Sequence, residues 1–126
     1  MLYLDTSATA KLLQEETESR ALASYLGTAG EPLVTSRVGI VELRRVGRRV
    51  GAADRADALA ATLAVVELDE LVEREALRVD ARLRTSDAIH LATAVLIGND
   101  LTAFVCYDAR LAAAAAASRL SVVAPC

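Results

Sequence analysis

The stretches Leu2-Tyr3-Leu4-Asp5-Thr6-Ser7 and Ala103-Phe104-Val105-Cys106-Tyr107-Asp108 lie near opposite ends of the chain and decide its fold. Each is a short apolar run typical of a buried strand that stops on an aspartate, and a helical pattern begins just after each. If the two strands are parallel neighbours in one sheet, both carboxylates lie at its carboxyl edge, where open α/β folds place their sites. Two acids held close together need a cation, so these motifs also predict a chemistry.

The segments between these motifs alternate between strand and helix patterns. We expect strands at residues 2–5, 33–35, 65–68, 103–107 and 120–123. We expect helices at residues 7–13, 17–26, 37–49, 54–64, 70–83, about 86–97 and 109–117, with Ser36, Asp69, and Thr85 or Ser86 as caps. Strands that alternate with helices form parallel βαβ units with right-handed crossovers. The sequence therefore predicts an α/β fold: a three-layer α/β/α sandwich with a mostly parallel central sheet.

Length and composition predict a single domain spanning residues 1–126 with an aliphatic core. Hydrophobic residues make up 54% of the chain and aromatic residues only 3%. No apolar run reaches the ~18 residues that a membrane span needs. We see no secretion signal at the start and no disulfide framework in the two cysteines, Cys106 and Cys126. A reduced cytoplasmic setting without membrane contact is the expectation.

The formal net charge is −3, which argues against a basic coat that would bind nucleic acid all over the surface. Nearly all basic residues are arginine, and Lys11 is the only lysine. Genomic base composition and a functional preference for arginine explain this usage equally well. An acidic protein can still bind RNA where its arginines cluster and a metal masks its acids.

Glu42 is the most informative single acid. In a helix over residues 37–49 it falls in a mostly apolar stripe, where an unpaired carboxylate is costly and tends to take up a proton. A nearby cation removes that difficulty. The alternative is a salt bridge to Arg45 or Arg49, which lie close in angle on the same helix.

Each of the other acids also has an ordinary structural explanation. Asp87 falls in the first turn of a helix, where the helix dipole favours acids, and Asp108 suits an N-cap. Asp5 is harder to explain in this way, because Thr6 and Ser7 offer caps of their own. Together with Glu42, however, the aspartates form a set of oxygen ligands that would repel one another without a cation. Such a set suits Mg²⁺ or Mn²⁺ rather than Zn²⁺, and such sites activate a water and stabilise charge on a phosphodiester.

Four stretches of the chain resemble the PIN domain family, and within it the VapC-type toxins of bacterial toxin–antitoxin pairs. They are Leu4-Asp5-Thr6-Ser7-Ala8, Val41-Glu42-Leu43, Leu83-Arg84-Thr85-Ser86-Asp87-Ala88-Ile89-His90-Leu91-Ala92 and Val105-Cys106-Tyr107-Asp108-Ala109-Arg110-Leu111. The third stretch is the most specific, and the resemblance covers nearly the whole chain in order.

The resemblance implies a Mg²⁺- or Mn²⁺-dependent endoribonuclease that is usually homodimeric and is inhibited by a small cognate antitoxin. It places the family's four metal-binding and catalytic acids on Asp5, Glu42, Asp87 and Asp108. Thr6 or Ser7 would support them by holding a water or a metal. Many relatives carry threonine two residues before the last acid, where this chain has Cys106. The implied mechanism is hydrolysis of RNA by a metal-activated water, without a histidine base.

Some expectations concern the substrate and the partner. Arg45, Arg49 and Arg110 are the candidates for RNA phosphate contact, while His90, the only histidine, is expected to pack or to cap its helix. Seven apolar residues of the expected helices either line a groove for a partner or simply pack these helices against each other: Leu12, Leu13, Leu22, Tyr25, Leu26, Leu59 and Leu63. An antitoxin segment would suit such a groove.

Two other readings compete with a nuclease. A phosphatase- or receiver-like α/β domain also begins with a strand that ends in aspartate, but such a phosphatase usually needs a second aspartate at the position of Ser7 and a lysine near a later strand. The second alternative is a catalytically silent PIN-like module that only binds a protein. The presence of all four acids argues against that alternative, and cation-linked stabilisation would separate the two.

Overall fold

The computed structural model describes residues 1–126. The strands are β1 (Leu2–Leu4), β2 (Leu33–Ser36), β3 (Ala64–Val66), β4 (Ala103–Val105) and β5 (Val122–Val123). The helices are α1 (Thr6–Leu13), α2 (Ser19–Ala29), α3 (Arg37–Arg49), α4 (Ala53–Ala61), α5 (Glu70–Ala76), α6 (Thr85–Ile97) and α7 (Ala109–Ala117). A single 3₁₀ turn, η1 (Gly98–Asp100), follows α6.

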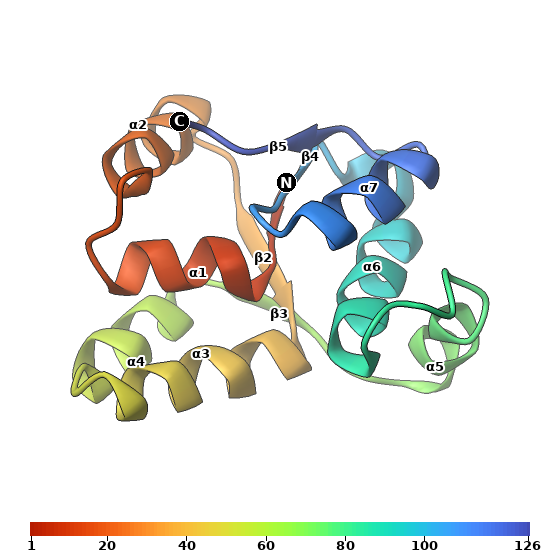
Figure 1. Ribbon diagram of the computed structural model, residues 1–126, viewed down its shortest axis with the longest axis horizontal. Helices are drawn as coiled ribbons and strands as arrows, with labels where there is room; N and C mark the ends of the chain where they lie inside the picture. Colours follow the sequence, from red (N-terminus) through yellow and green to blue (C-terminus); the bar gives the residue numbers. More distant parts are fainter.

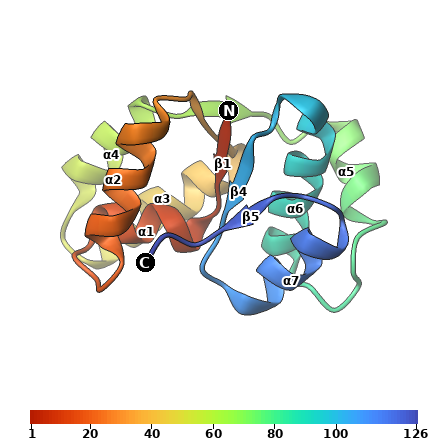
Figure 2. The same ribbon diagram turned by 90° about the horizontal axis from the view of Figure 1, so that it is seen from above.

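All five strands pair in parallel in the order β3-β2-β1-β4-β5, as Figures 1 and 2 allow the reader to follow. β1 lies in the centre and pairs with β4 in a register that sets Leu4 opposite Val105. The expected α/β fold and the expected pairing of the first and fourth strands are therefore confirmed. The two strands that end on Asp5 and near Asp108 are direct neighbours at the middle of the sheet.

Side chains of β1 alternate between the two faces of the sheet, as the pleat of a strand requires. Leu2 and Leu4 pack with α1 and α2, while Tyr3 packs with α6 and α7 on the other face. α3 and α4 form a further core with α1 around Leu43. In Figure 2, α1 to α4 occupy one side of the sheet and α5 to α7 the other, which gives the three layers.

The strand order reverses between β1 and β4, because the chain moves from β1 to β2 and β3 before it crosses to β4. Parallel α/β sheets bind their ligands outside the carboxyl ends of the strands at such a switch point. Asp5 and the turn that contains Asp108 follow these two strands directly. The topology therefore concentrates polar side chains at one edge of the molecule.

Several helix boundaries differ from the sequence-based expectation: α2 covers Ser19–Ala29 instead of residues 17–26, and α4 ends at Ala61 instead of near residue 64. α5 ends at Ala76 instead of near residue 83, because the Asp80 carboxylate accepts a hydrogen bond from the backbone N–H of Arg82 and stabilises a turn that competes with the helix. α6 begins at Thr85 with Arg84 at the N-cap position and no side-chain cap, so the expected cap by Thr85 or Ser86 was wrong. The caps by Ser36 and Asp69 are confirmed.

No helix combines the length and the apolar character that crossing a bilayer would require.

Candidate active site

Asp5 is buried, with 3% of its surface exposed, at the point where β1 passes into α1. One carboxylate oxygen, Oδ1, accepts hydrogen bonds from the Ala8 backbone N–H (3.0 Å) and from the Ser7 hydroxyl (2.6 Å). Asp5 is thus itself the N-cap of α1, and the idea that Thr6 or Ser7 would cap this helix was wrong. The cap fixes the carboxylate at the end of the central strand.

Asp108 takes the equivalent position after β4 and caps α7, where its Oδ1 accepts a hydrogen bond from the Leu111 backbone N–H (2.9 Å). Cys106 lies between this turn and Asp5. Its buried thiol donates to Oδ2 of Asp5 (3.2 Å) and lies 3.5 Å from the backbone oxygen of Asp108. Burial and the neighbouring Asp5 charge raise the pKa of the Cys106 thiol, so it stays protonated as a donor. The thiol therefore links the two strand-end acids.

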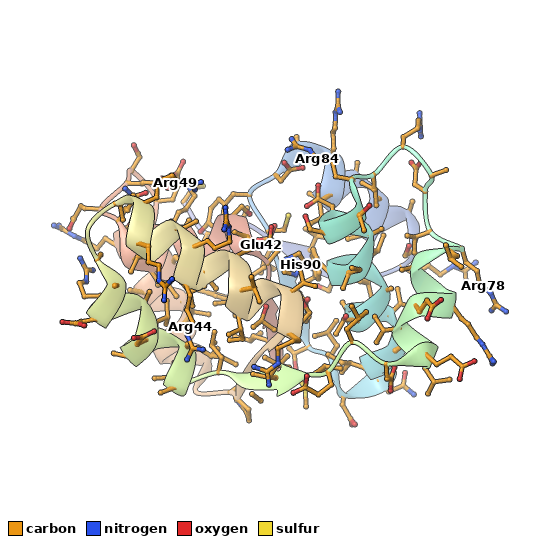
Figure 3. The ribbon with its side chains drawn as sticks, turned by 90° about the horizontal axis from the view of Figure 1, so that it is seen from below. Glu42, Arg44, Arg49, Arg78, Arg84 and His90 are labelled. Atoms are coloured by element: carbon orange, nitrogen blue, oxygen red, sulfur yellow. The ribbon has the colours of Figure 1, made fainter.

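Glu42 points from α3 toward α6, where His90 meets it (Figure 3). Its Oε1 accepts hydrogen bonds from the Thr6 hydroxyl (2.7 Å) and from Nε2 of His90 (2.8 Å). Burial opposes ionisation of Glu42, but these bonds outweigh it and hold its pKa below the ordinary value. The alternative salt bridge to Arg45 or Arg49 does not form.

Asp87 lies in the first turn of α6 and is the acid with the least favourable surroundings. Partial burial and then the charge of Asp108 raise its pKa, and the Glu42 charge acts in the same direction. This coupling shows that the carboxylates from α3, from α6 and from the turn after β4 influence one another electrostatically.

The donor set fits a hard divalent cation, since it consists of carboxylate oxygens whose repulsion a cation would relieve. As the side chains lie, however, no group of three or more His, Cys, Asp or Glu side chains is arranged to hold an ion. Oδ1 of Asp5 and Oε1 of Glu42 are already occupied by donors from the protein. Neither bond to Glu42 uses its Oε2, whereas Oδ2 of Asp5 accepts a hydrogen bond from the Cys106 thiol (3.2 Å).

Thr6 and Ser7, the expected supporting residues, each hold an acid. Thr6 donates to Glu42, and Ser7 donates to Asp5 while it accepts a hydrogen bond from the Tyr107 backbone N–H (2.8 Å). Sequence reasoning missed the part played by His90. The only signal was its place one helical turn after Asp87 on the same helix.

The candidate RNA-binding arginines lie on two surfaces. Arg45, Arg48 and Arg49 line a cavity of about 320 Å³ at the end of α3, and none of them forms an ion pair. Arg44 lies on the other side of α3, where it pairs with Asp57 (Figure 3). Arg110 lines a separate cavity of about 450 Å³ with Arg82 and Asp80, beside α7.

The seven apolar residues that were candidates for a partner groove mostly pack between the helices. Leu13, Leu22 and Leu63 are buried in the core, and the other four are half-buried. The groove that remains beside α1 and α2 has a volume of about 270 Å³ and is lined mainly by polar side chains. These residues do not form an open apolar groove.

Comparison with known proteins places the chain among its relatives. Residues 2–123 match the PIN domain family. The chain is 45% identical over 118 residues to ribonuclease VapC47 of Mycobacterium tuberculosis, which covers 88% of this chain and 87% of that protein. It is 43% identical over 131 residues to ribonuclease VapC35 of the same organism, covering 99% and 97%.

A solved toxin–antitoxin complex from Klebsiella pneumoniae has the same fold, with a TM-score of 0.79 at 20% identity, covering 100% of this chain and 98% of that chain. At that identity the likeness shows the fold alone. The family assignment depends instead on the match over residues 2–123 and on the relatives above 40% identity. The chain belongs to the PIN domain family, and its relatives within that family are VapC ribonucleases.

Proposed function

We propose that the chain is a Mg²⁺- or Mn²⁺-dependent endoribonuclease and the toxin of a type II toxin–antitoxin pair. Two observations support the proposal: Asp5 and Asp108 directly follow the neighbouring strands β1 and β4, and the pKa of Asp87 is raised first by burial and then by the charge of Asp108, with Glu42 acting in the same direction. Relatives named ribonucleases support the activity, and the fold shared with a toxin–antitoxin complex supports the partner.

In this proposal the four acids hold the cation, directly or through water. When bound, Mg²⁺ or Mn²⁺ supplies a Lewis acid that activates a water and stabilises the charge on the phosphodiester. Asp5 and Asp108 are fixed by the helix starts that they cap, and Glu42 is fixed by Thr6 and His90. His90 is fully buried, so it does not reach RNA as a general base.

The free arginines at the end of α3 and Arg110 beside α7 are the phosphate contacts in this proposal. Arg45 and Arg49 follow Glu42 on α3 by one and two helical turns, so a strand that crosses the acids would pass them. Stacking of RNA bases on aromatic side chains plays little part, because Tyr3 and Phe104 are fully buried. Recognition then depends on RNA shape and backbone contacts.

The test of the activity compares Asp5→Asn with Asp57→Asn on structured RNA in Mg²⁺. Asparagine caps a helix as well as aspartate does, so the first variant keeps its fold. Asp57 is an exposed acid on α4 that pairs with Arg44, and it serves as the matched control. We expect cleavage by the wild type and the control, its loss in EDTA, and its loss in Asp5→Asn.

Undiminished metal-dependent cleavage by Asp5→Asn would contradict the proposal. Absence of cleavage in the wild type, with no stabilisation by Mg²⁺ or Mn²⁺, would favour the alternative of a silent protein-binding module. Co-expression with a small neighbouring reading frame tests the antitoxin, which we expect to co-purify and to suppress cleavage. Light scattering of the purified chain tests the proposed homodimer.

A further inference from the structure

A buried chain of hydrogen bonds connects Tyr3 of the central strand β1 to Glu42 through His90. The Tyr3 hydroxyl lies 2.7 Å from Nδ1 of His90, and Nε2 of the same ring lies 2.8 Å from Oε1 of Glu42. Thr6 joins this chain, with its hydroxyl 2.7 Å from Oε1 and 3.2 Å from Nε2. Tyr3 and His90 are fully buried, so water does not compete for these bonds.

The chemistry of the two ends fixes the direction of every bond. Oε1 of Glu42 already accepts a hydrogen bond from the Thr6 hydroxyl, so at its 2.8 Å contact with Nε2 of His90 the ring nitrogen is the donor. Burial raises the pKa of Tyr3, so its phenol keeps its proton and donates it to Nδ1. The ring is therefore held in one tautomer and one orientation.

The backbone of α3 approaches His90 closely at Gly39. A Cβ added to Gly39 of α3 would lie 3.0 Å from Cε1 of His90 and 2.3 Å from Oγ1 of Thr35. Thr35 itself is buried and donates its hydroxyl to the Leu4 backbone oxygen (2.7 Å). Glycine at position 39 is thus what lets α3 approach the imidazole closely enough for Glu42 to reach it.

We propose that His90 is a positioning residue that holds Glu42 by one oxygen and leaves the other, Oε2, to a divalent cation. The inference rests on the proposed function, because it assigns Glu42 to the cation. Two donors converge on Oε1, and neither bond uses Oε2. Donors behind a ligand commonly fix its orientation, and their loss weakens metal affinity by about 10- to 100-fold.

The test compares His90→Asn with His90→Gln. The glutamine amide reaches the position of Nε2 and can still donate to Glu42, whereas the asparagine amide reaches only the position of Nδ1. Both variants replace the same buried ring, so a purely structural role would weaken them alike. Thr93→Val is the control, since Thr93 is buried on the same helix and bonds only the Ile89 backbone oxygen.

Calorimetric titration of each variant with Mn²⁺ alone, without RNA, is the main readout. We expect His90→Asn to bind Mn²⁺ about 10- to 100-fold more weakly than the wild type. We expect His90→Gln to recover most of that loss, and Thr93→Val to bind like the wild type. Equal affinities in His90→Asn and the wild type, or equal losses in the two His90 variants, would overturn the inference.

Nitrogen-15 NMR of His90 in the unaltered chain gives a second readout that no unfolded variant can obscure. The inference requires hydrogen on Nε2, and a ring protonated only on Nδ1 would overturn it. If Asp5→Asn abolishes cleavage while His90→Asn binds Mn²⁺ normally, the inference fails and the proposed function stands. If the wild type binds no Mn²⁺, both fail.

Discussion

Three acids of the candidate site, Asp5, Asp108 and Glu42, fall into two halves that are held in different ways. In the strand-end half, Asp5 and Asp108 cap the helices that follow them and the Cys106 thiol links them. In the helix-face half, Glu42 is held by Thr6 and His90, which come from other parts of the chain. The strand-end acids are thus fixed largely by local backbone geometry, whereas Glu42 depends on long-range packing. The two halves should respond differently when each is broken.

The largest expected effect is on activity, and it should be the same for both halves. Asp108→Asn and Glu42→Gln each remove one carboxylate from the proposed cation site, so we expect RNA cleavage to fall by at least ~100-fold, a loss of about 3 kcal/mol of transition-state stabilisation. Single-turnover cleavage of structured RNA in Mg²⁺ measures it. A variant from one half that retains full activity would remove that acid from the site.

The second prediction concerns the free energy of unfolding and tests the close packing in the helix-face half. Gly39→Ala should destabilise the chain by about 1–3 kcal/mol, because the added methyl group meets Thr35 and His90. In an open helix the same change would stabilise by about 0.5–1 kcal/mol. Urea unfolding measures the difference. Gly27→Ala, in α2 with open space around it, is the matched control and should not destabilise.

The carboxylate variants should also differ in stability. Glu42→Gln should cost about 1–2 kcal/mol at neutral pH, since it weakens the charge-assisted bonds from Thr6 and His90. Asp108→Asn should cost less than about 0.5 kcal/mol, because asparagine caps equally well.

At acid pH, the free energies of unfolding of the wild type and of Glu42→Gln should become more similar. The pKa of Glu42 lies below its ordinary value of 4.5, so its contribution is fully present above that value and is lost as pH falls through the lowered pKa. Urea unfolding between pH 7 and pH 3 measures this. A gap between wild type and variant that stays constant over the whole range would contradict the assigned cause.

The smallest effect has the opposite sign. The raised pKa of Asp87 means that its charge destabilises the folded chain at pH values above that pKa. Asp87→Asn should therefore raise the melting temperature of the metal-free protein by about 1–3 °C. Added Mn²⁺ should stabilise the wild type more than this variant. Differential scanning fluorimetry checks both, and a lower melting temperature without metal would contradict the account.

The strand-end half could be predicted from the sequence because its signals are local. A short apolar run that stops on an aspartate, followed by a helical pattern, located Asp5 and Asp108, and the parallel pairing of their strands followed from the alternation of elements. The error at Asp5 was to treat capping and function as alternatives, whereas the cap is what fixes this carboxylate.

The helix-face half could be predicted only in part. The apolar stripe identified Glu42 as a carboxylate in need of a partner, but the true partner, His90, lies 48 positions away on a different helix. The close approach permitted by Gly39 is a property of two packed elements, and no periodicity within either element carries it. The early end of α5 was missed for a similar reason, since a side-chain turn at Asp80 outweighs helix propensity.

In the proposed site, the two halves meet around a divalent cation. Anomalous diffraction from crystals of the wild type and of Asp5→Asn, both grown in Mn²⁺, shows whether they do. We expect one strong peak bounded by the carboxylates of Asp5, Glu42, Asp87 and Asp108 in the wild type, and its loss in the variant. Absence of that peak in the wild type, or a peak of equal strength in Asp5→Asn, would contradict the proposed site.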